Sequence, residues 1–151
     1  MRRGPAAVAR VGLALVVLTG GVLAGLVAGG CTYYPSVADM GGVRLRFEEG
    51  RAVRSGNGAA AVYFKLNSTG KYGDVLKGAE SPLARRAELR GAGGGRISEL
   101  EIPGASVVTF DRSGPHVALA DFTRALQAGE VIIVTLHFEK SGPLGLVTVV
   151  E

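Results

Sequence analysis

An uncharged apolar stretch that ends in a single cysteine is the feature that most limits what this chain can fold into. No charged side chain occurs from position 11 to position 30, and the only charges before this stretch are Arg2, Arg3 and Arg10. A basic start, an apolar run and small residues before a cleavage point are typical of an export signal. We therefore expect the folded part of the chain to lie outside the cytoplasm.

The residues around Cys31 indicate how this signal is processed. Small residues, Ala28 to Gly30, stand directly before the cysteine, although a leucine is more usual at the position of Ala28. They favour cleavage by a lipoprotein-processing peptidase, which would leave a diacylglycerol on the Cys31 sulfur. Lipidation would also remove the only free thiol from an oxidising compartment. We predict a lipoprotein signal peptide over residues 1–30. The alternative is an uncleaved anchor, because about 20 apolar residues are roughly enough to span a bilayer.

The predicted mature chain has a composition that argues against nucleic-acid binding. Removal of the three signal arginines leaves 14 of the 17 basic residues, against 13 acidic ones, and the only adjacent basic pair is Arg85-Arg86. A nucleic-acid-binding surface needs a cluster of lysine and arginine side chains, which this composition does not provide. The remaining length suits one domain with its own hydrophobic core.

Alternation of apolar and polar residues predicts an all-β domain. We assign residues 31–42 to the lipidated cysteine and a tether containing Pro35 and Gly41-Gly42, and residues 43–151 to the domain. About nine short strands separated by turn residues favour an antiparallel sandwich or barrel. Asp121–Ala128 is at most one helical turn. Six residues should point into one core: Val62, Phe64, Leu66, Val134, Leu136 and Phe138.

Gly91–Gly95 is the one low-complexity segment of the predicted domain. A glycine-rich loop that binds a dinucleotide follows a parallel strand and opens a helix, and no such unit surrounds this segment. We expect a hairpin tip here.

Several short motifs resemble the periplasmic PCu(A)C copper chaperones. They are Gly58–Phe64 followed by Asn67 and Gly70, Ser81-Pro82 before Ala87-Glu88-Leu89, Leu100–Pro103, Ala125–Glu130, and Leu136–Gly142. The similarity covers roughly residues 43–151. It implies a cupredoxin-like Greek-key β-sandwich that carries Cu(I) outside the cytoplasm.

The same resemblance implies a ligand set that this chain has largely lost. The family binds Cu(I) through two histidines and two methionines, which are soft ligands for a soft ion. Arg90 stands at the first histidine, Arg96-Ile97 at the first methionine, and Ala118 at the second methionine. Only His116 matches, so it is the sole candidate metal ligand carried over from the family.

Two functions remain open at this point. One is an envelope interaction or scaffold protein, anchored to the membrane by lipid, with lost or much weakened Cu(I) binding and a protein partner in the envelope. The other is a working copper chaperone with rearranged ligands, for which His116, His137 and Met40 are the candidates.

Catalysis is not expected. Ser113, His116 and Asp121 lie close in sequence, but no nucleophile-elbow or metal-hydrolase motif accompanies them. Catalytic groups must meet in space, which closeness in sequence does not ensure.

Overall fold

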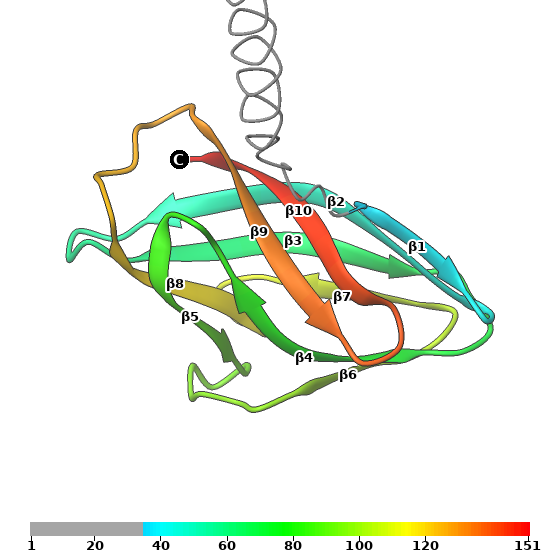
Figure 1. Ribbon diagram of the computed structural model, residues 1–151. Helices are drawn as coiled ribbons and strands as arrows, with labels where there is room; N and C mark the ends of the chain where they lie inside the picture. The colour runs from blue at the N-terminus through cyan, green and yellow to red at the C-terminus, as the bar shows by residue number, and fades with distance from the viewer. Residues whose placement is uncertain (1–34) are drawn as a thin grey trace, which may run out of the picture. The chain divides into compact units, whose positions relative to one another are not determined.

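The computed structural model describes residues 35–151, which form ten β-strands and no helix (Figure 1). None of the elements in this range is a helix that could cross a membrane. The strands are β1 (Val37–Met40), β2 (Val43–Arg54), β3 (Ala60–Ser68), β4 (Asp74–Glu80), β5 (Ala84–Arg90), β6 (Leu100–Ile102), β7 (Ser106–Phe110), β8 (His116–Phe122), β9 (Val131–Phe138) and β10 (Gly142–Val150). The predicted all-β class is confirmed.

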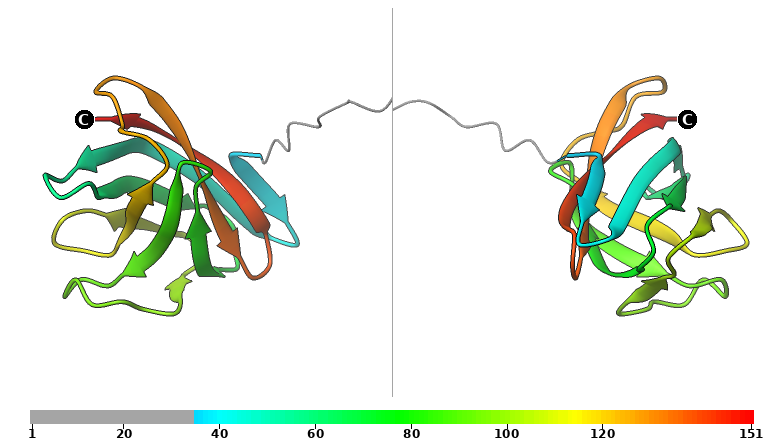
Figure 2. Two further views of the ribbon diagram at one scale, coloured as in Figure 1. Left: turned by 60° about the vertical axis from the view of Figure 1, so that its left-hand side comes forward. Right: turned by 90° about the vertical axis from the view of Figure 1, so that its right-hand side faces the viewer.

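The strands form one curled sheet whose two halves pack on each other as layers. The strand order is β5-β8-β3-β2-β10-β9-β4-β6, with β1 added to β2 and β7 added to β3. Figures 1 and 2 show β9 and β10 side by side in one layer, while β3 and β8 belong to the other. One pairing differs from the predicted antiparallel pattern, because β10 runs parallel to β2.

β2 belongs to both layers, because a bulge bends it near its middle. Its register with β3 shifts between Glu48 and Arg51, and Glu49 has a φ of 56°. A Cβ atom on Gly50 would clash with the carbonyl oxygen of Val147, so the close approach of β2 to β10 requires glycine at this position.

The apolar side chains that alternate along the strands fill the space between the layers. All six predicted core residues are at most 4% exposed. Phe64 stacks on Phe110 with ring centroids 4.1 Å apart, and Phe47 contacts Phe64 edge-on at 5.7 Å. Burial of such side chains contributes about 1.5–3 kcal/mol each.

The predicted tether over residues 31–42 contains a strand. β1 pairs antiparallel with the start of β2, from Val37 opposite Arg46 to Met40 opposite Val43. Gly41 and Gly42 have φ values of 58° and 84°, as a two-residue hairpin turn requires. The glycine pair is therefore a turn within the domain. Residues 31–34 lie outside the described range.

A buried carboxylate holds the turn between β9 and β10. Asp74, only 2% exposed, accepts backbone N–H groups from Val75 at 2.8 Å and from Lys140 and Ser141 at 2.9 Å. Burial raises the pKa of the Asp74 carboxyl, but these hydrogen bonds outweigh it, and the pKa lies below its ordinary value of 3.8.

Candidate metal centre

The β5–β8 pair brings together positions at which the resemblance implies copper ligands. Arg90 on β5 is the register partner of His116 on β8, and Glu88 is the partner of Ala118. Arg96 forms an isolated bridge with Arg90 across the glycine-rich turn. The expected positions are therefore adjacent, and the chain differs from the family in the side chains that occupy them.

These residues lie on the outer face of the sheet because their neighbours face inward. Leu89, between Glu88 and Arg90, is 5% exposed, and Val117, between His116 and Ala118, is fully buried. Successive side chains of a strand point to opposite faces. His116 and Ala118 therefore share the outer face, and Val117 points into the core. The site can therefore change without changing the core.

An ion pair occupies the centre of this face. Arg90 Nη2 donates to Glu88 Oε2 at 2.7 Å, and Arg90 Nη1 donates to the carbonyl oxygen of Gly94 at 3.1 Å. The Arg90 Nε–H is buried and has no hydrogen-bond partner among the described residues. A second cation, Arg96, lies 3.8 Å from the other oxygen of Glu88 but is 74% exposed. A guanidinium ion thus fills the position where the family has its first histidine.

The glycine-rich segment is the tight hairpin tip that the sequence predicted. Gly91 N–H donates to the Gly95 carbonyl at 2.9 Å, and Gly94, with a φ of 75°, donates to the Gly91 carbonyl at 2.8 Å. This conformation directs the Gly94 carbonyl oxygen towards Arg90, so Arg90 connects the end of β5 to the turn.

His116 is a half-buried side chain beside an aromatic ring. Its ring centroid lies 6.0 Å from that of Tyr63 on β3, at an interplanar angle of 63°. Its Nδ1 is 3.3 Å from the carbonyl oxygen of Gly114, so the tautomer protonated at Nδ1 can donate to this carbonyl and leaves the Nε2 lone pair free. The site thus offers one imidazole nitrogen.

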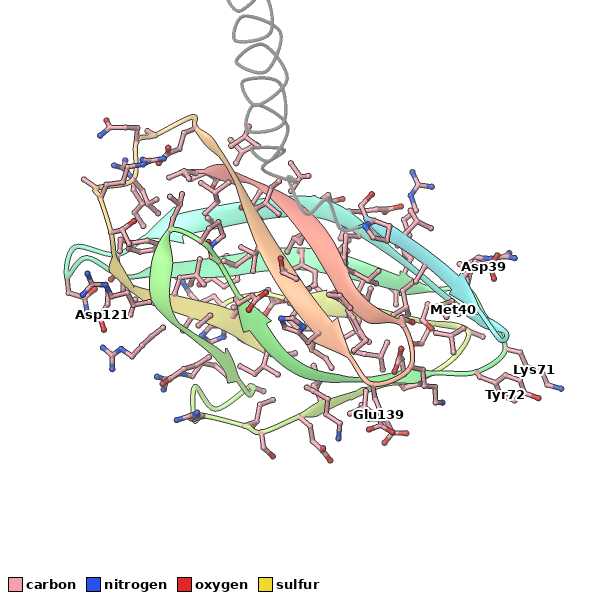
Figure 3. All side chains as sticks on the ribbon, in the orientation of Figure 1. Asp39, Met40, Lys71, Tyr72, Asp121 and Glu139 are labelled. Carbon is pink, nitrogen blue, oxygen red and sulfur yellow. The ribbon has the colours of Figure 1, made fainter. Side chains whose placement is uncertain are left out.

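The other candidate metal ligands, His137 and Met40, do not lie next to His116. His137 lies on β9, where its Nε2 is 3.2 Å from Glu80 Oε1, and Met40 is at the end of β1 (Figure 3). No two of the strands β1, β8 and β9 pair with each other. Within residues 35–151, no group of three or more His, Cys, Asp or Glu side chains is arranged to hold a metal ion.

The site residues therefore do not fit Cu(I). One imidazole and no thioether are present at these positions, whereas a soft monovalent ion favours several soft ligands. Cys31, the predicted lipidation site, lies outside the described residues.

The three residues considered for catalysis are engaged elsewhere. The Ser113 hydroxyl donates to Asp111 at 2.9 Å, and Asp121 Oδ2 lies 2.6 Å from Arg86 Nε. His116 takes part in neither of these pairs, so the geometry of a nucleophile activated by histidine is not formed.

The sequence interpretation missed three contributors to this site: Glu88, Gly94 and Tyr63. Glu88 and Arg90 are two apart on a predicted strand, which places opposite charges on one face and could have indicated the ion pair. No sequence signal placed Tyr63 next to His116, because this contact depends on the order of β3, β8 and β5.

Comparison with known proteins agrees with the fold. The family described as "Putative lipoprotein LpqE-like" matches residues 43–150. No curated protein matches the chain.

Three solved structures share the architecture. The copper-bound PCuAC domain from PmoF2 is 26% identical, with a TM-score of 0.64, and the match covers 76% of this chain and 97% of that one. The solution structure of CuI-DR1885 from Deinococcus radiodurans is 25% identical, with a TM-score of 0.61 and coverage of 82% and 83%. The apo PCuAC domain from PmoF1, 22% identical with a TM-score of 0.64 and coverage of 76% and 98%, shows the same fold. The chain thus belongs to the LpqE-like family, and its domain is of the cupredoxin-like PCuAC copper-chaperone type.

Proposed function

We propose that this chain is a lipid-anchored protein of the cell envelope in which the ion pair between Arg90 and Glu88 takes the place of the copper site. It serves as an interaction or scaffold protein and binds Cu(I) weakly or not at all, and it has no catalytic role. The observation that carries this proposal is the Arg90 guanidinium, which is bonded to Glu88 and Gly94 and lies opposite the one remaining histidine.

For the affinity of this site for Cu(I), the lack of metal ligands matters more than the repulsion between the ion and the Arg90 guanidinium. A cuprous ion about 5 Å from a guanidinium is repelled by about 3 kcal/mol at an effective dielectric constant of about 20. Glu88 offsets most of that repulsion, because its carboxylate is in contact with Arg90. Missing ligands are not offset in this way, since a lone imidazole leaves the rest of the coordination shell to water, a poor ligand for Cu(I).

The Glu88 and Arg90 side chains already occupy the space that a metal ion would need, which supports the same conclusion. The side chains of Glu88 and Arg90 are 22% and 36% exposed, so they fill a partly buried position. A metal ion entering here would have to displace the guanidinium and leave Glu88 without its closest partner, which costs free energy.

Competition against a chromogenic Cu(I) chelator tests this proposal. We expect the wild-type protein to lose the competition, and His116→Ala to behave like wild type. Arg90→His combined with Arg96→Met and Ala118→Met restores two imidazoles and two thioethers on the same outer face. This variant should bind Cu(I) more tightly by several orders of magnitude.

The control variant places an imidazole and a thioether where they cannot converge. Arg85→His with Val107→Met adds an imidazole and a thioether to β5 and β7, away from His116, and should leave affinity unchanged. A wild-type protein that retained Cu(I) against the chelator would contradict the proposal. A copper chaperone using His116, His137 and Met40 would then be the function to test.

The anchor has its own test. Intact mass of the protein purified from membranes should show a chain that begins at Cys31 and carries a diacylglycerol. Cys31→Ser should remove that mass and release the protein from the membrane. A chain that keeps residues 1–30 and an unmodified Cys31 would contradict lipidation and favour a membrane-spanning anchor.

A further inference from the structure

The outer face of the β9–β10 hairpin carries four exposed aliphatic side chains in one patch. Val131, Ile133, Val147 and Val149 are 61%, 48%, 55% and 45% exposed. Val149 is the register partner of Val131, and Val147 is the partner of Ile133. Side chains of paired residues on one face lie about 5 Å apart, so the four form one continuous surface, which we call the β9–β10 patch.

In the part that carries the patch, this hairpin has apolar side chains on both faces, which a solvated sheet does not need. Its inward side chains include Ile132, Val134 and Leu146, all at most 3% exposed. A sheet with one face in water alternates apolar residues with polar ones. Isolated exposed aliphatic residues are ordinary, but a contiguous apolar patch marks an interaction surface.

The chain leaves the domain next to this patch. The carbonyl oxygen of Pro35 accepts a hydrogen bond of 2.9 Å from the backbone N–H of Gly145 on β10. Val147 is two residues further along the same strand, about 7 Å away, and points to the same outer face. The N-terminal segment is therefore fixed to the strand that carries half of the patch.

The length of the remaining tether is short. Cys31 precedes Pro35 by four residues, Thr32, Tyr33 and Tyr34 lying between them. Four residues span at most about 14 Å in any conformation. Tyrosine is also enriched at the boundary between membrane and water.

We propose that the β9–β10 patch rests on the lipid surface and orients the domain on the membrane. This inference rests on the proposed lipidation of Cys31. With the acyl chains inserted, the short tether holds β10 near the headgroups, and a weak apolar contact is then sufficient because the anchor makes it intramolecular. The Arg90–Glu88 face, on the other layer, points away from the membrane and is accessible to a protein partner.

A second copy of the chain suits the patch less well. A stable interface between proteins buries about 800 Å² on each partner. Four partly exposed aliphatic side chains on two strands provide much less. Contact with a lipid surface, in contrast, does not require a protein surface that is complementary to the patch.

The absence of tryptophan from the chain makes the orientation directly measurable, because a single introduced tryptophan has no fluorescent background. We would insert the full lipidated protein into phosphatidylethanolamine–phosphatidylglycerol vesicles, with brominated lipids as quenchers. Val147→Trp and, as a second probe on the neighbouring strand, Ile133→Trp report on the patch. Val107→Trp is the control, because Val107 is equally exposed, at 60%, on β7.

We expect blue-shifted emission and strong quenching for the Val147→Trp and Ile133→Trp variants, and neither effect for Val107→Trp. Adding Cys31→Ser to either patch variant should abolish the quenching. A lipidated protein whose patch probes emit as in water would overturn the orientation and leave the anchor intact. A blue shift without quenching, together with cross-linking between copies, would assign the patch to self-association instead. An unmodified Cys31 would overturn both the anchor and this orientation.

Discussion

The β9–β10 hairpin and the β5–β8 pair are both antiparallel and both line the core, yet their outer faces and their ends are built differently. The hairpin turn is held by a buried aspartate, and the outer face at the start of β9 and the end of β10 is apolar. The β5–β8 pair ends in a glycine-rich turn held by Arg90, and its outer face is charged. The turn of the hairpin is held by hydrogen bonds to a buried carboxylate, and the turn after β5 is held by contacts that water can partly replace.

This difference shows that side chains on an outer face can change while the fold persists. Inward residues such as Leu89 and Val117 keep the β5–β8 pair in place, whichever side chains stand beside them on the outer face. Replacement of histidine and methionine by arginine and alanine on that face removes no core contact. We therefore expect substitutions in the two regions to differ in their cost to stability.

The largest effect should come from Phe138→Ala in the hairpin. Phe138 is 4% exposed and lies 6.2 Å from the Phe47 ring, centroid to centroid. Its truncation removes buried area and leaves a cavity, so the free energy of unfolding should fall by about 3–5 kcal/mol. Chemical denaturation measures this loss. Val107→Ala, at an exposed site, should change it by less than about 0.5 kcal/mol. Equal losses for the two variants would contradict the assigned core.

An intermediate effect is expected from Asp74→Asn, which keeps the shape of the side chain and removes its charge. Hydrogen bonds to a charged group contribute about 1.5–3 kcal/mol, and the variant should lose stability of this order at neutral pH. Chemical denaturation of the wild-type protein and of the Asp74→Asn variant between pH 7 and pH 3 separates the contribution of the Asp74 charge to stability from that of side-chain packing.

The pH dependence follows from the lowered pKa of Asp74. A carboxyl with a lower pKa in the folded state stabilises the protein above its unfolded pKa, near 3.8, and this contribution is lost as the pH falls through the folded value. The two proteins should therefore converge in stability in acid. A constant difference across the whole range would show that the charge of Asp74 does not stabilise the turn.

The smallest effect should come from Arg90→Met at the candidate site. Partly exposed ion pairs contribute about 0–1 kcal/mol, and this variant also removes a buried Nε–H that has no partner in the described domain. Arg96 remains close to Glu88 and limits the cost of losing Arg90. We expect a loss below about 1 kcal/mol in chemical denaturation, with no gain in Cu(I) affinity. A loss as large as that of Phe138→Ala would show that the ion pair maintains the fold.

Much of the fold was predictable because burial leaves a periodic signal in the sequence. Alternation identified the strands around Phe64 and Leu136 and the residues that face the core. It did not reveal β1, because Gly41-Gly42 is as typical of a linker as of a hairpin turn. The parallel pairing of β10 with β2 was also hidden, since it depends on the bulge at Glu49 and Gly50.

The sequence predicted which residues of the candidate site lie near each other, and not the contacts that they make. The resemblance to the copper chaperones placed Arg90 and His116 at equivalent positions, and the register of β5 with β8 brings them together. The spacing of Glu88 and Arg90 was the available signal for their ion pair, because residues two apart on a strand share a face. The contact of Arg90 with the Gly94 carbonyl left no such signal. Cys31, the remaining predicted site, is tested by the mass measurement alone.

The bend in β2 has a consequence for how the domain loses its structure. Because one continuous strand pairs with β3 through most of its length and with β10 near its end, neither layer can separate without breaking the bonds of the other. Unfolding should therefore be cooperative, with backbone amides of the two layers exchanging with solvent at a common free energy instead of opening one after the other. A domain of this kind bears mechanical load as a single body.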